Sequence, residues 1–204
     1  MTVRLVLATR NAHKVAELRR ILADADLSVE VLTVADFLDV PDVVESGITF
    51  AANALLKARA VRDATGLPCV ADDSGFCLDV LNGMPGVFSA RWAGRHGQDR
   101  ANLELVLAQV EDVPDEHLGA RFVCAAALAR PDGVEAVVEG VWPGRMVRAP
   151  RGSNGFGYDP IFVPEGESRT SAELSDAEKD ASSHRGRALR ALVPALRELT
   201  TAGS

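Results

Sequence analysis

The chain has 204 residues, of which 47% are hydrophobic, and a formal net charge of −7. This size and apolar content suit one globular domain with an ample core, and we expect a single domain over residues 1–204. Acidic and basic residues are mixed along the chain. That pattern argues against a nucleic-acid polymer or an anionic membrane surface as the main partner, because both require a concentrated basic face.

The three cysteines lie in apolar segments without metal-type spacing. Their odd number indicates buried free thiols in a reducing compartment. The apolar run at residues 3–8 is too short for a signal peptide or a transmembrane helix. We therefore expect a cytoplasmic protein with no membrane partner. The cysteines are Cys69, Cys77 and Cys124.

The first predicted strand leads into a polar turn and then a helix, in which apolar residues recur at helical spacing over residues 15–22. The turn, residues 9–14, could cap this helix or hold a phosphate oxygen through Thr9 and Asn11. Lys14 opposes the helix dipole, which hints at an anionic ligand, although a solvated lysine is the simpler interpretation. No Walker-type glycine-lysine loop occurs, so a P-loop fold is not supported.

A second predicted strand, residues 29–33, leads into an acidic loop at residues 39–47. Thr49 could cap the helix that follows. Glu45 precedes this helix and Lys57 lies on it, so both could reach the carboxyl ends of the strands. Either residue could equally be ordinary surface charge.

The most informative stretch is a predicted buried strand, residues 67–71, that ends in Asp72, Asp73, Ser74 and Gly75. Hard oxygen ligands at the carboxyl end of a buried strand are typical of an active site. Neighbouring side chains of a strand point to opposite faces, so the two aspartates can share one site only if the strand breaks there. The glycine would permit such a break. A simple strand-ending turn is the alternative.

Further along, a turn-rich run at residues 82–94 predicts a loop that closes a pocket or meets a partner subunit. An amphipathic helix is expected over residues 103–110. Residues 120–129 and 134–141 read as an antiparallel hairpin. The predicted sheet is therefore mixed.

The loop at residues 151–160 combines three glycines with Phe156 and Tyr158. An aromatic ring that stacks on a nucleobase contributes roughly 1–3 kcal/mol, so a base-binding loop is a reasonable hypothesis. The alternative is a turn whose aromatic rings fold back into the core.

A capping-box pattern at residues 175–178 starts a C-terminal helical region. On one unbroken helix, Lys179, His184 and Arg185 would project in different directions. If a serine at 182–183 instead caps a new helix, the histidine and arginine occupy its first turn, where backbone N–H groups also point.

Five motifs follow one another along nearly the whole chain, and together they are specific although each alone is weak. They are Thr9-x-Asn11-x-x-Lys14, Ala71-Asp72-Asp73-Ser74-Gly75, Pro85-Gly86-x-x-Ser89-Ala90-Arg91, Gly155-Phe156-Gly157-Tyr158-Asp159-Pro160 and Ser183-His184-Arg185-Gly186. This set resembles the inosine triphosphate pyrophosphatase family, also described as non-canonical purine nucleoside triphosphate pyrophosphatases.

The resemblance implies an Mg²⁺-dependent hydrolase that converts dITP, ITP or XTP to the monophosphate and pyrophosphate. It also implies a homodimer and an elongated single-domain α/β fold, with a central mixed β-sheet flanked by helices and an active-site cleft between two lobes. One departure is visible. Where the family often has Glu-Asn-Ala, this chain has Ala52-Asn53-Ala54, so position 52 can have no metal role.

Resemblance and residue chemistry together predict roles for the site residues. Glu45, Asp73 and nearby Asp72 suit Mg²⁺, which prefers oxygen ligands. Asp73 would help to deprotonate the attacking water, and the catalytic lysines Lys14 and Lys57 would neutralise charge on the leaving group. The predicted substrate-binding residues are Thr9, Arg10, Asn11, Ala12, His13, Lys14, Ser74, Phe156, Gly157, Tyr158, Asp159, Lys179, His184 and Arg185.

Base choice follows from the oxygen at C6 of hypoxanthine and xanthine. Donors from Lys179, His184, Arg185 or the loop backbone would face that oxygen, whereas the amine of adenine would leave them without an acceptor. Two alternatives remain open. One is a pyrophosphatase for modified pyrimidine or methylated nucleotides, which would not be expected to combine the Phe156 loop with residues 183–185. The other is a nucleotide-sensing module without turnover.

Overall fold

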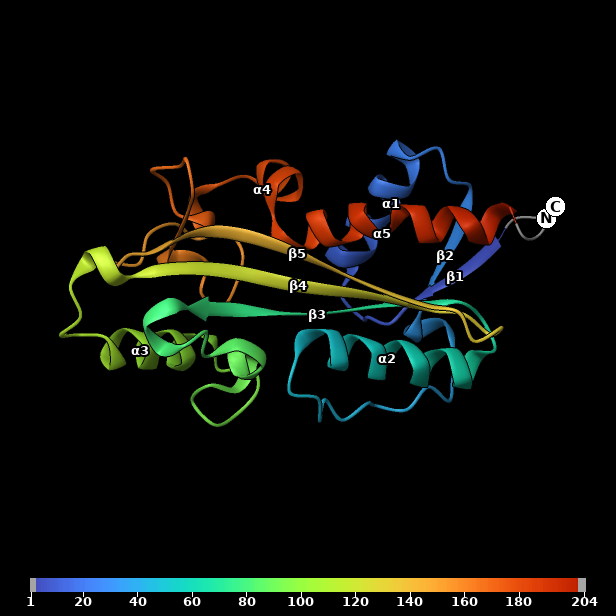
Figure 1. Ribbon diagram of the computed structural model, residues 1–204, viewed down its shortest axis with the longest axis horizontal. Coiled ribbons are helices and arrows are strands. Elements are labelled where there is room, and N and C mark those ends of the chain that lie inside the picture. Colours follow the sequence, from blue (N-terminus) through green and yellow to red (C-terminus); the bar gives the residue numbers. More distant parts are fainter. Residues whose placement is uncertain (1–2, 202–204) are drawn as a thin grey trace. The chain divides into compact units, whose positions relative to one another are not determined.

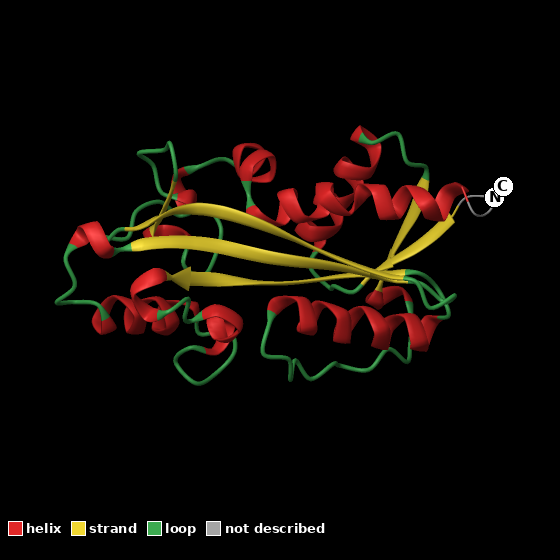
Figure 2. Ribbon diagram, viewed as in Figure 1, coloured by secondary structure: helices red, strands yellow, loops and turns green. Residues whose placement is uncertain are grey.

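The computed structural model describes residues 3–201, in which six strands form one sheet with the order β2-β1-β3-β4-β5-β6. Figure 2 distinguishes the strands, in yellow, from the helices, in red. Strand β1 pairs in parallel with β2 and β3, whereas β5 pairs antiparallel with β6. The short connection between β4 and β5 permits only an antiparallel hairpin. The predicted mixed sheet is therefore confirmed. The strands are β1 (Val3–Leu7), β2 (Val29–Thr33), β3 (Cys69–Leu78), β4 (Gly119–Ala129), β5 (Glu135–Met146) and β6 (Phe162–Pro164).

The helices begin where the sequence supplies capping residues. Asn11 accepts a hydrogen bond from the His13 backbone at the start of α1, and Thr49 does the same for Ala52 at the start of α2. Gly66 ends α2 in the left-handed conformation, with a φ of 67°. The α-helices are α1 (Ala12–Asp24), α2 (Phe50–Thr65), α3 (Asp99–Gln109), α4 (Asp176–Ser182) and α5 (His184–Thr201).

The described chain divides into two compact units. The first contains the residues up to Asp73, the segment Cys124–Gly140 and the residues from Arg185 onward. The second contains Ser74–Val123 and Val141–His184. Within residues 3–201, no helix is both long enough and apolar enough to cross a membrane.

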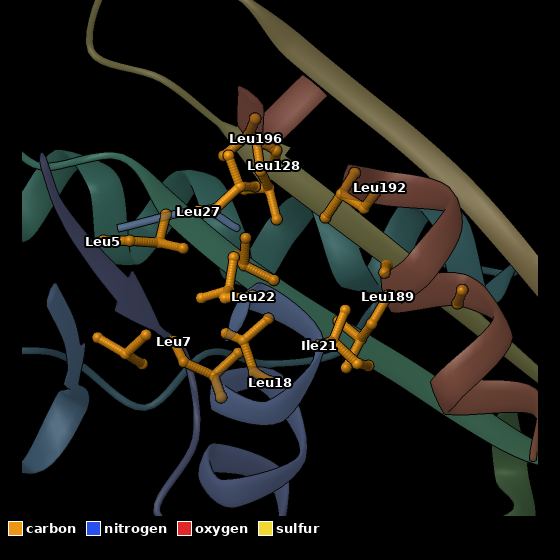
Figure 3. Packing of buried hydrophobic residues seen from close by; sticks show 14 of the residues in the cluster. Leu5, Leu7, Leu18, Ile21, Leu22, Leu27, Leu128, Leu189, Leu192 and Leu196 are labelled. Carbon is orange, nitrogen blue, oxygen red and sulfur yellow. The ribbon is translucent and has the colours of Figure 1, made fainter. Parts of the chain in front are cut away.

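In the first unit, helices cover both faces of the sheet: α1 and α5 lie on one side and α2 on the other (Figure 1). Successive side chains of β1 point to opposite faces of the sheet, so this strand packs against the helices on both sides. Leu5 and Leu7 join the cluster formed with α1 and α5, whereas Val6 packs with Val61 of α2. Figure 3 shows leucines of β1, α1, β4 and α5 gathered in the larger cluster.

Replacing Leu192 by alanine should lower the free energy of unfolding by about 2–5 kcal/mol, because this α5 side chain is fully buried in that cluster. Urea denaturation measures the change. Leu38→Ala is the matched control, since Leu38 is fully exposed and its loss should cost less than about 0.5 kcal/mol. Equal losses in the two variants would contradict the burial of Leu192 in this cluster.

The second unit has a core of its own that is rich in aromatic residues. Phe76 of β3 stacks on Tyr158, with ring centroids 4.9 Å apart, and meets Phe122 edge to face. Helix α3 packs against the same cluster through Leu103 and Val106. Tyr158 therefore anchors the loop at residues 151–160 to this core.

One expectation about the strands was wrong, and one strand was not predicted. Strand β3 does not end at Gly75 but continues without a break to Leu78. Strand β6 was not predicted, because three residues are too few to show a periodic pattern. By contrast, the helical break near Ser183 is confirmed: that residue has an extended ψ of 158° between α4 and α5.

Candidate functional site

The unbroken strand β3 separates its two aspartates. Asp72 contacts Lys14 of α1 and Arg185 of α5, whereas Asp73 contacts Asn53 and Lys57 of α2. Neighbouring side chains of a strand point to opposite faces, so the two carboxylates serve different helical layers. The expectation that a break would bring them into one site is therefore wrong.

The Asp72 cluster consists of Lys14, Glu17, Asp72 and Arg185. Lys14 Nζ donates to both oxygens of Asp72, at 3.0 and 2.8 Å, and Arg185 Nε donates to Oδ2 at 3.2 Å. Asp72 is 5% exposed. Burial alone would raise its pKa, but the charges of Lys14 and Arg185 outweigh burial and hold the Asp72 pKa well below its usual range.

Glu17 of α1 contributes the second carboxylate of this cluster and is 4% exposed. Its Oε2 lies 3.8 Å from Arg185 Nη1. Burial raises the pKa of Glu17, and the Arg185 charge opposes that shift. The cluster therefore holds the Arg185 guanidinium between two carboxylates on the α1 side of the sheet.

The Asp73 cluster consists of Glu45, Asn53, Lys57 and Asp73. Lys57 Nζ lies 2.6 Å from Glu45 Oε1 and 3.6 Å from Asp73 Oδ1, and Asn53 Nδ2 donates to Asp73 Oδ2 at 3.0 Å. Burial raises the pKa of Asp73, opposed by the Lys57 charge. Burial alone would lower the pKa of Lys57, but the Asp73 charge and the Glu45 hydrogen bond raise it. One cation thus bridges two carboxylates.

The donor set of the Asp73 cluster fits Mg²⁺. Two carboxylates already meet around one positive charge, and Mg²⁺ is commonly held by one or two carboxylates together with waters and substrate phosphates. No group of three or more His, Cys, Asp or Glu side chains that could hold a metal occurs within the described part of the chain. Both oxygens of Asp72 already accept hydrogen bonds, so Glu45 and Asp73 fit a metal better than Asp72 does.

In the predicted phosphate-binding turn, the side-chain oxygens of Thr9 and Asn11 accept hydrogen bonds from the local backbone. Thr9 Oγ1 accepts from the Asn11 backbone at 3.1 Å, and Asn11 Oδ1 accepts from the His13 backbone at 2.9 Å. Arg10 turns away to pair with Asp42 at 3.0 Å. The turn exposes Asn11, Ala12 and His13 to solvent, while Lys14 is held by Asp72.

In the second unit, the Asp159 network consists of Phe156, Asp159, Ser171 and Lys179. Asp159 Oδ2 accepts from the Phe156 backbone at 2.9 Å and from Lys179 Nζ at 2.8 Å. Ser171 Oγ donates to Oδ1 at 2.6 Å. Asp159 is buried, so this carboxylate fixes the start of the aromatic loop to α4.

The two aromatic residues of this loop have different environments. Phe156 is 63% exposed. Tyr158 is buried against Phe76 and donates from its hydroxyl to the Ser89 carbonyl at 2.9 Å, so its ring folds back into the core. The backbone N–H of Gly157 donates to Asp99 at 3.1 Å. Phe156 therefore has the exposed ring that stacking on a ligand requires.

His184 and Ser74 are also placed in the second unit. The His184 ring stacks on Phe122, with centroids 4.9 Å apart, and lies nearly parallel to Trp142. Ser74 directly follows Asp73 in β3 and is partly buried. Sequence reasoning did not identify Glu17, Asn53 or Ser171. Glu17 lies three residues after Lys14, a spacing that places both on one helix face and could have indicated it.

Fold and clusters together define an α/β protein with a carboxylate–lysine cluster on each face of one central strand. The chain belongs to the Ham1 family, whose family model matches residues 5–195. A protein of Streptomyces coelicolor named dITP/XTP pyrophosphatase is 65% identical over 196 residues, which cover 96% of this chain and 98% of that relative. A protein of the same name from Mycobacterium tuberculosis H37Rv is 57% identical over 202 residues, which cover 98% of each chain.

Solved structures agree with the fold. A nucleoside-triphosphatase / dITP/XTP pyrophosphatase from Mycobacterium abscessus is 56% identical, with a TM-score of 0.80, over 95% of this chain and 100% of that one. A HAM1 protein from Coxiella burnetii is 43% identical, with a TM-score of 0.88, over 97% of this chain and 100% of that one. The family resemblance indicated by the five motifs is therefore confirmed, and so is the α/β fold with a mixed sheet.

Proposed function

We propose that this protein hydrolyses non-canonical purine nucleoside triphosphates, namely dITP, ITP and XTP, to the monophosphate and pyrophosphate. The observation that carries the proposal is the Asp73 cluster, in which a partly buried carboxylate, a second carboxylate and a lysine meet. The names of relatives that are 57–65% identical support the same substrate class. Such an activity would remove these nucleotides before they are incorporated into DNA or RNA.

In this proposal the cleaved bond is the α–β phosphoanhydride. Asp73 accepts a proton from a water whose oxygen attacks the α-phosphorus, the bond from that phosphorus to the bridging oxygen breaks, and pyrophosphate leaves. Lys57 and Lys14 neutralise negative charge on the phosphates. Glu45 and Asp73 would hold Mg²⁺, which would supply further charge neutralisation at phosphate oxygens. Asp72 acts as the counter-ion that holds Lys14 and Arg185 in place.

The remaining predicted residues would bind the substrate. The turn at residues 9–14 and Ser74 would contact phosphate oxygens, and Phe156 would stack on the base. Lys179, Arg185 and His184 would supply the donors for the oxygen at C6. Gly157, Tyr158 and Asp159 would shape the base-binding loop, Tyr158 and Asp159 from buried positions.

The test is pyrophosphate release from dITP, XTP, dATP, dGTP and dTTP, each with and without Mg²⁺. We expect metal-dependent turnover confined to dITP and XTP. Donors aimed at the C6 oxygen would stay unpaired against the amine of adenine, whereas guanine shares that oxygen and must be excluded by a contact at C2. Fast turnover of canonical nucleotides would favour a pyrophosphatase of another specificity. Binding without turnover would favour a nucleotide sensor.

Replacing Phe156 by alanine should weaken dITP binding by roughly 5- to 150-fold, which corresponds to the loss of one stacked base. The exposed ring has little packing to lose, so the fold should persist. Binding is measured by calorimetry with dITP, and kcat by pyrophosphate release. Phe156→Tyr keeps the aromatic face and serves as the control. Unchanged affinity in the alanine variant would contradict the stacking role.

We also propose a cytoplasmic homodimer formed from single-domain subunits, as the family resemblance implies. Met84 and Phe88 are both about two-fifths exposed in the turn after β3, so they are candidates for an apolar subunit contact. Sedimentation equilibrium of the wild-type protein and of Phe88→Ser tests this. A monomeric wild type would contradict the homodimer.

A further inference from the structure

The side chain of Asn53 connects the two carboxylate-bearing segments of the Asp73 cluster. Asn53 lies on α2 and is fully buried. Its Oδ1 accepts from the Gly47 backbone N–H at 2.7 Å, and its Nδ2 donates to Asp73 Oδ2 at 3.0 Å. Gly47 follows Glu45 by two residues. One amide therefore contacts both the loop that carries Glu45 and the carboxylate of Asp73.

The two contacts fix which way the amide points. A backbone N–H can only donate, so the oxygen of Asn53 must face Gly47. The nitrogen must then face Asp73, whose ionised carboxylate can only accept. An asparagine satisfies both partners at once, whereas an aspartate would keep the acceptor and lose the donor. The pairing leaves Asp73 Oδ1 as the oxygen that lies toward Lys57.

The loop approaches α2 so closely that position 47 has no room for a side chain. A Cβ added to Gly47 would lie 2.7 Å from Asn53 Oδ1 and 2.8 Å from the Ala52 Cβ, closer than real contacts allow. Any larger residue at 47 would therefore displace the loop or the Asn53 amide. This glycine offers a way to disturb the contact without changing Asn53.

We infer that Asn53 is a positioning residue: it fixes the rotamer of Asp73 and the distance of the Glu45 loop from it. The inference rests on the proposed function, because it assigns Asp73 and Glu45 to that reaction. Partners that orient a site's charged ligands typically alter metal affinity or activity by about 10–100-fold when they are removed. A merely structural asparagine would change stability alone.

Asn102 provides a matched control. It is a buried asparagine on α3 whose Oδ1 accepts from the Ala93 backbone at 2.7 Å, so it also joins a helix to a loop. Asn102 belongs to the second compact unit, whereas the Asp73 cluster belongs to the first. Asn102→Ala therefore measures how much stability is lost when a buried asparagine that joins a helix to a loop is removed away from the Asp73 cluster.

The experiment compares Asn53→Asp, Asn53→Ala, Gly47→Ala and Asn102→Ala in the full-length protein. For the first three we expect kcat for dITP to fall by about 10–100-fold with little change in KM, whereas Asn102→Ala should keep its kcat. Titration with Mg²⁺ alone should show weaker binding in Asn53→Ala and Gly47→Ala. Hydrogen exchange of the Gly47 amide should accelerate in Asn53→Ala but stay slow in Asn53→Asp, which keeps the acceptor.

A kcat loss in Asn53→Ala no larger than in Asn102→Ala would overturn the inference, and so would unchanged Mg²⁺ affinity in Asn53→Ala. If Asn53→Ala is too unstable to measure, the inference is tested by kcat in Asn53→Asp and by kcat and Mg²⁺ affinity in Gly47→Ala. Wild-type values in these variants would overturn it. Failure of the proposed function gives a different result, since the wild-type protein would then release no pyrophosphate from dITP. Hydrogen exchange of the Gly47 amide and Mg²⁺ affinity, which need no turnover, would still show whether Asn53 positions the Asp73 cluster.

Discussion

Replacing Asp73 by asparagine should lower kcat for dITP by roughly 10²–10⁴-fold while nucleotide binding persists. Asparagine has nearly the same volume but cannot accept the proton of the attacking water, and it is a much weaker ligand for Mg²⁺. Asp73 is partly buried and held by Asn53, so the substitution should not disturb the strand. Pyrophosphate release measures kcat, and calorimetry with dITP measures affinity.

Phe156→Ala provides the opposite pattern, since it should weaken binding and largely spare kcat. The two variants together test whether chemistry and base binding are separable. Equal loss of dITP affinity in Asp73→Asn and Phe156→Ala would contradict the roles proposed for both residues. Retained turnover in Asp73→Asn would assign the proton-accepting role to another group.

Replacing Asp72 by asparagine should lower the free energy of unfolding by about 3–5 kcal/mol, because it leaves the buried charges of Lys14 and Arg185 without their shared counter-ion. Turnover should fall as well, since both cations lose the carboxylate that orients them. Urea denaturation at neutral pH measures the change. Asp24→Asn is the control, because Asp24 is exposed at the end of α1 and its charge should matter little.

The same variant gives a pH prediction. Lys14 and Arg185 hold the folded-state pKa of Asp72 below its unfolded value of about 3.9, so the native state binds this proton more weakly than the unfolded state. The stability from Asp72 is therefore fully present above about pH 4 and is lost as the pH falls through the lower folded-state pKa. The stability difference between wild type and Asp72→Asn should shrink on acidification. A difference that stays constant down to pH 2 would contradict this.

Much of the architecture could be predicted because it depends on local signals. Thr49 and the Ser175–Glu178 pair are caps whose hydrogen bonds form within one turn, so α2 and α4 begin where the sequence indicates. The extended Ser183 likewise breaks the C-terminal helix as one hypothesis required. All three cysteines are buried, as their apolar neighbours predicted.

Other features could not be predicted, because several segments far apart in the chain decide them. Gly75 permits a turn but does not require one, and hydrogen bonding to neighbouring strands keeps β3 extended through it. Tyr158 is equally compatible with an exposed and a buried ring, and the aromatic core around Phe76 determines that it is buried. Glu17 and Asn53 resembled ordinary helix residues, because their partners lie many positions away in the sequence.

The sequence by itself determined the family, the mixed α/β class and the set of candidate carboxylates and lysines, because motif order, periodicity and residue chemistry can all be read along a chain. Only the tertiary structure decided how those charges are paired. It places Asp72 with Lys14 and Arg185, and Asp73 with Lys57, on opposite faces of one strand. The physical reason is the alternation of side chains along an unbroken strand, which directs each carboxylate to whichever helix covers its face.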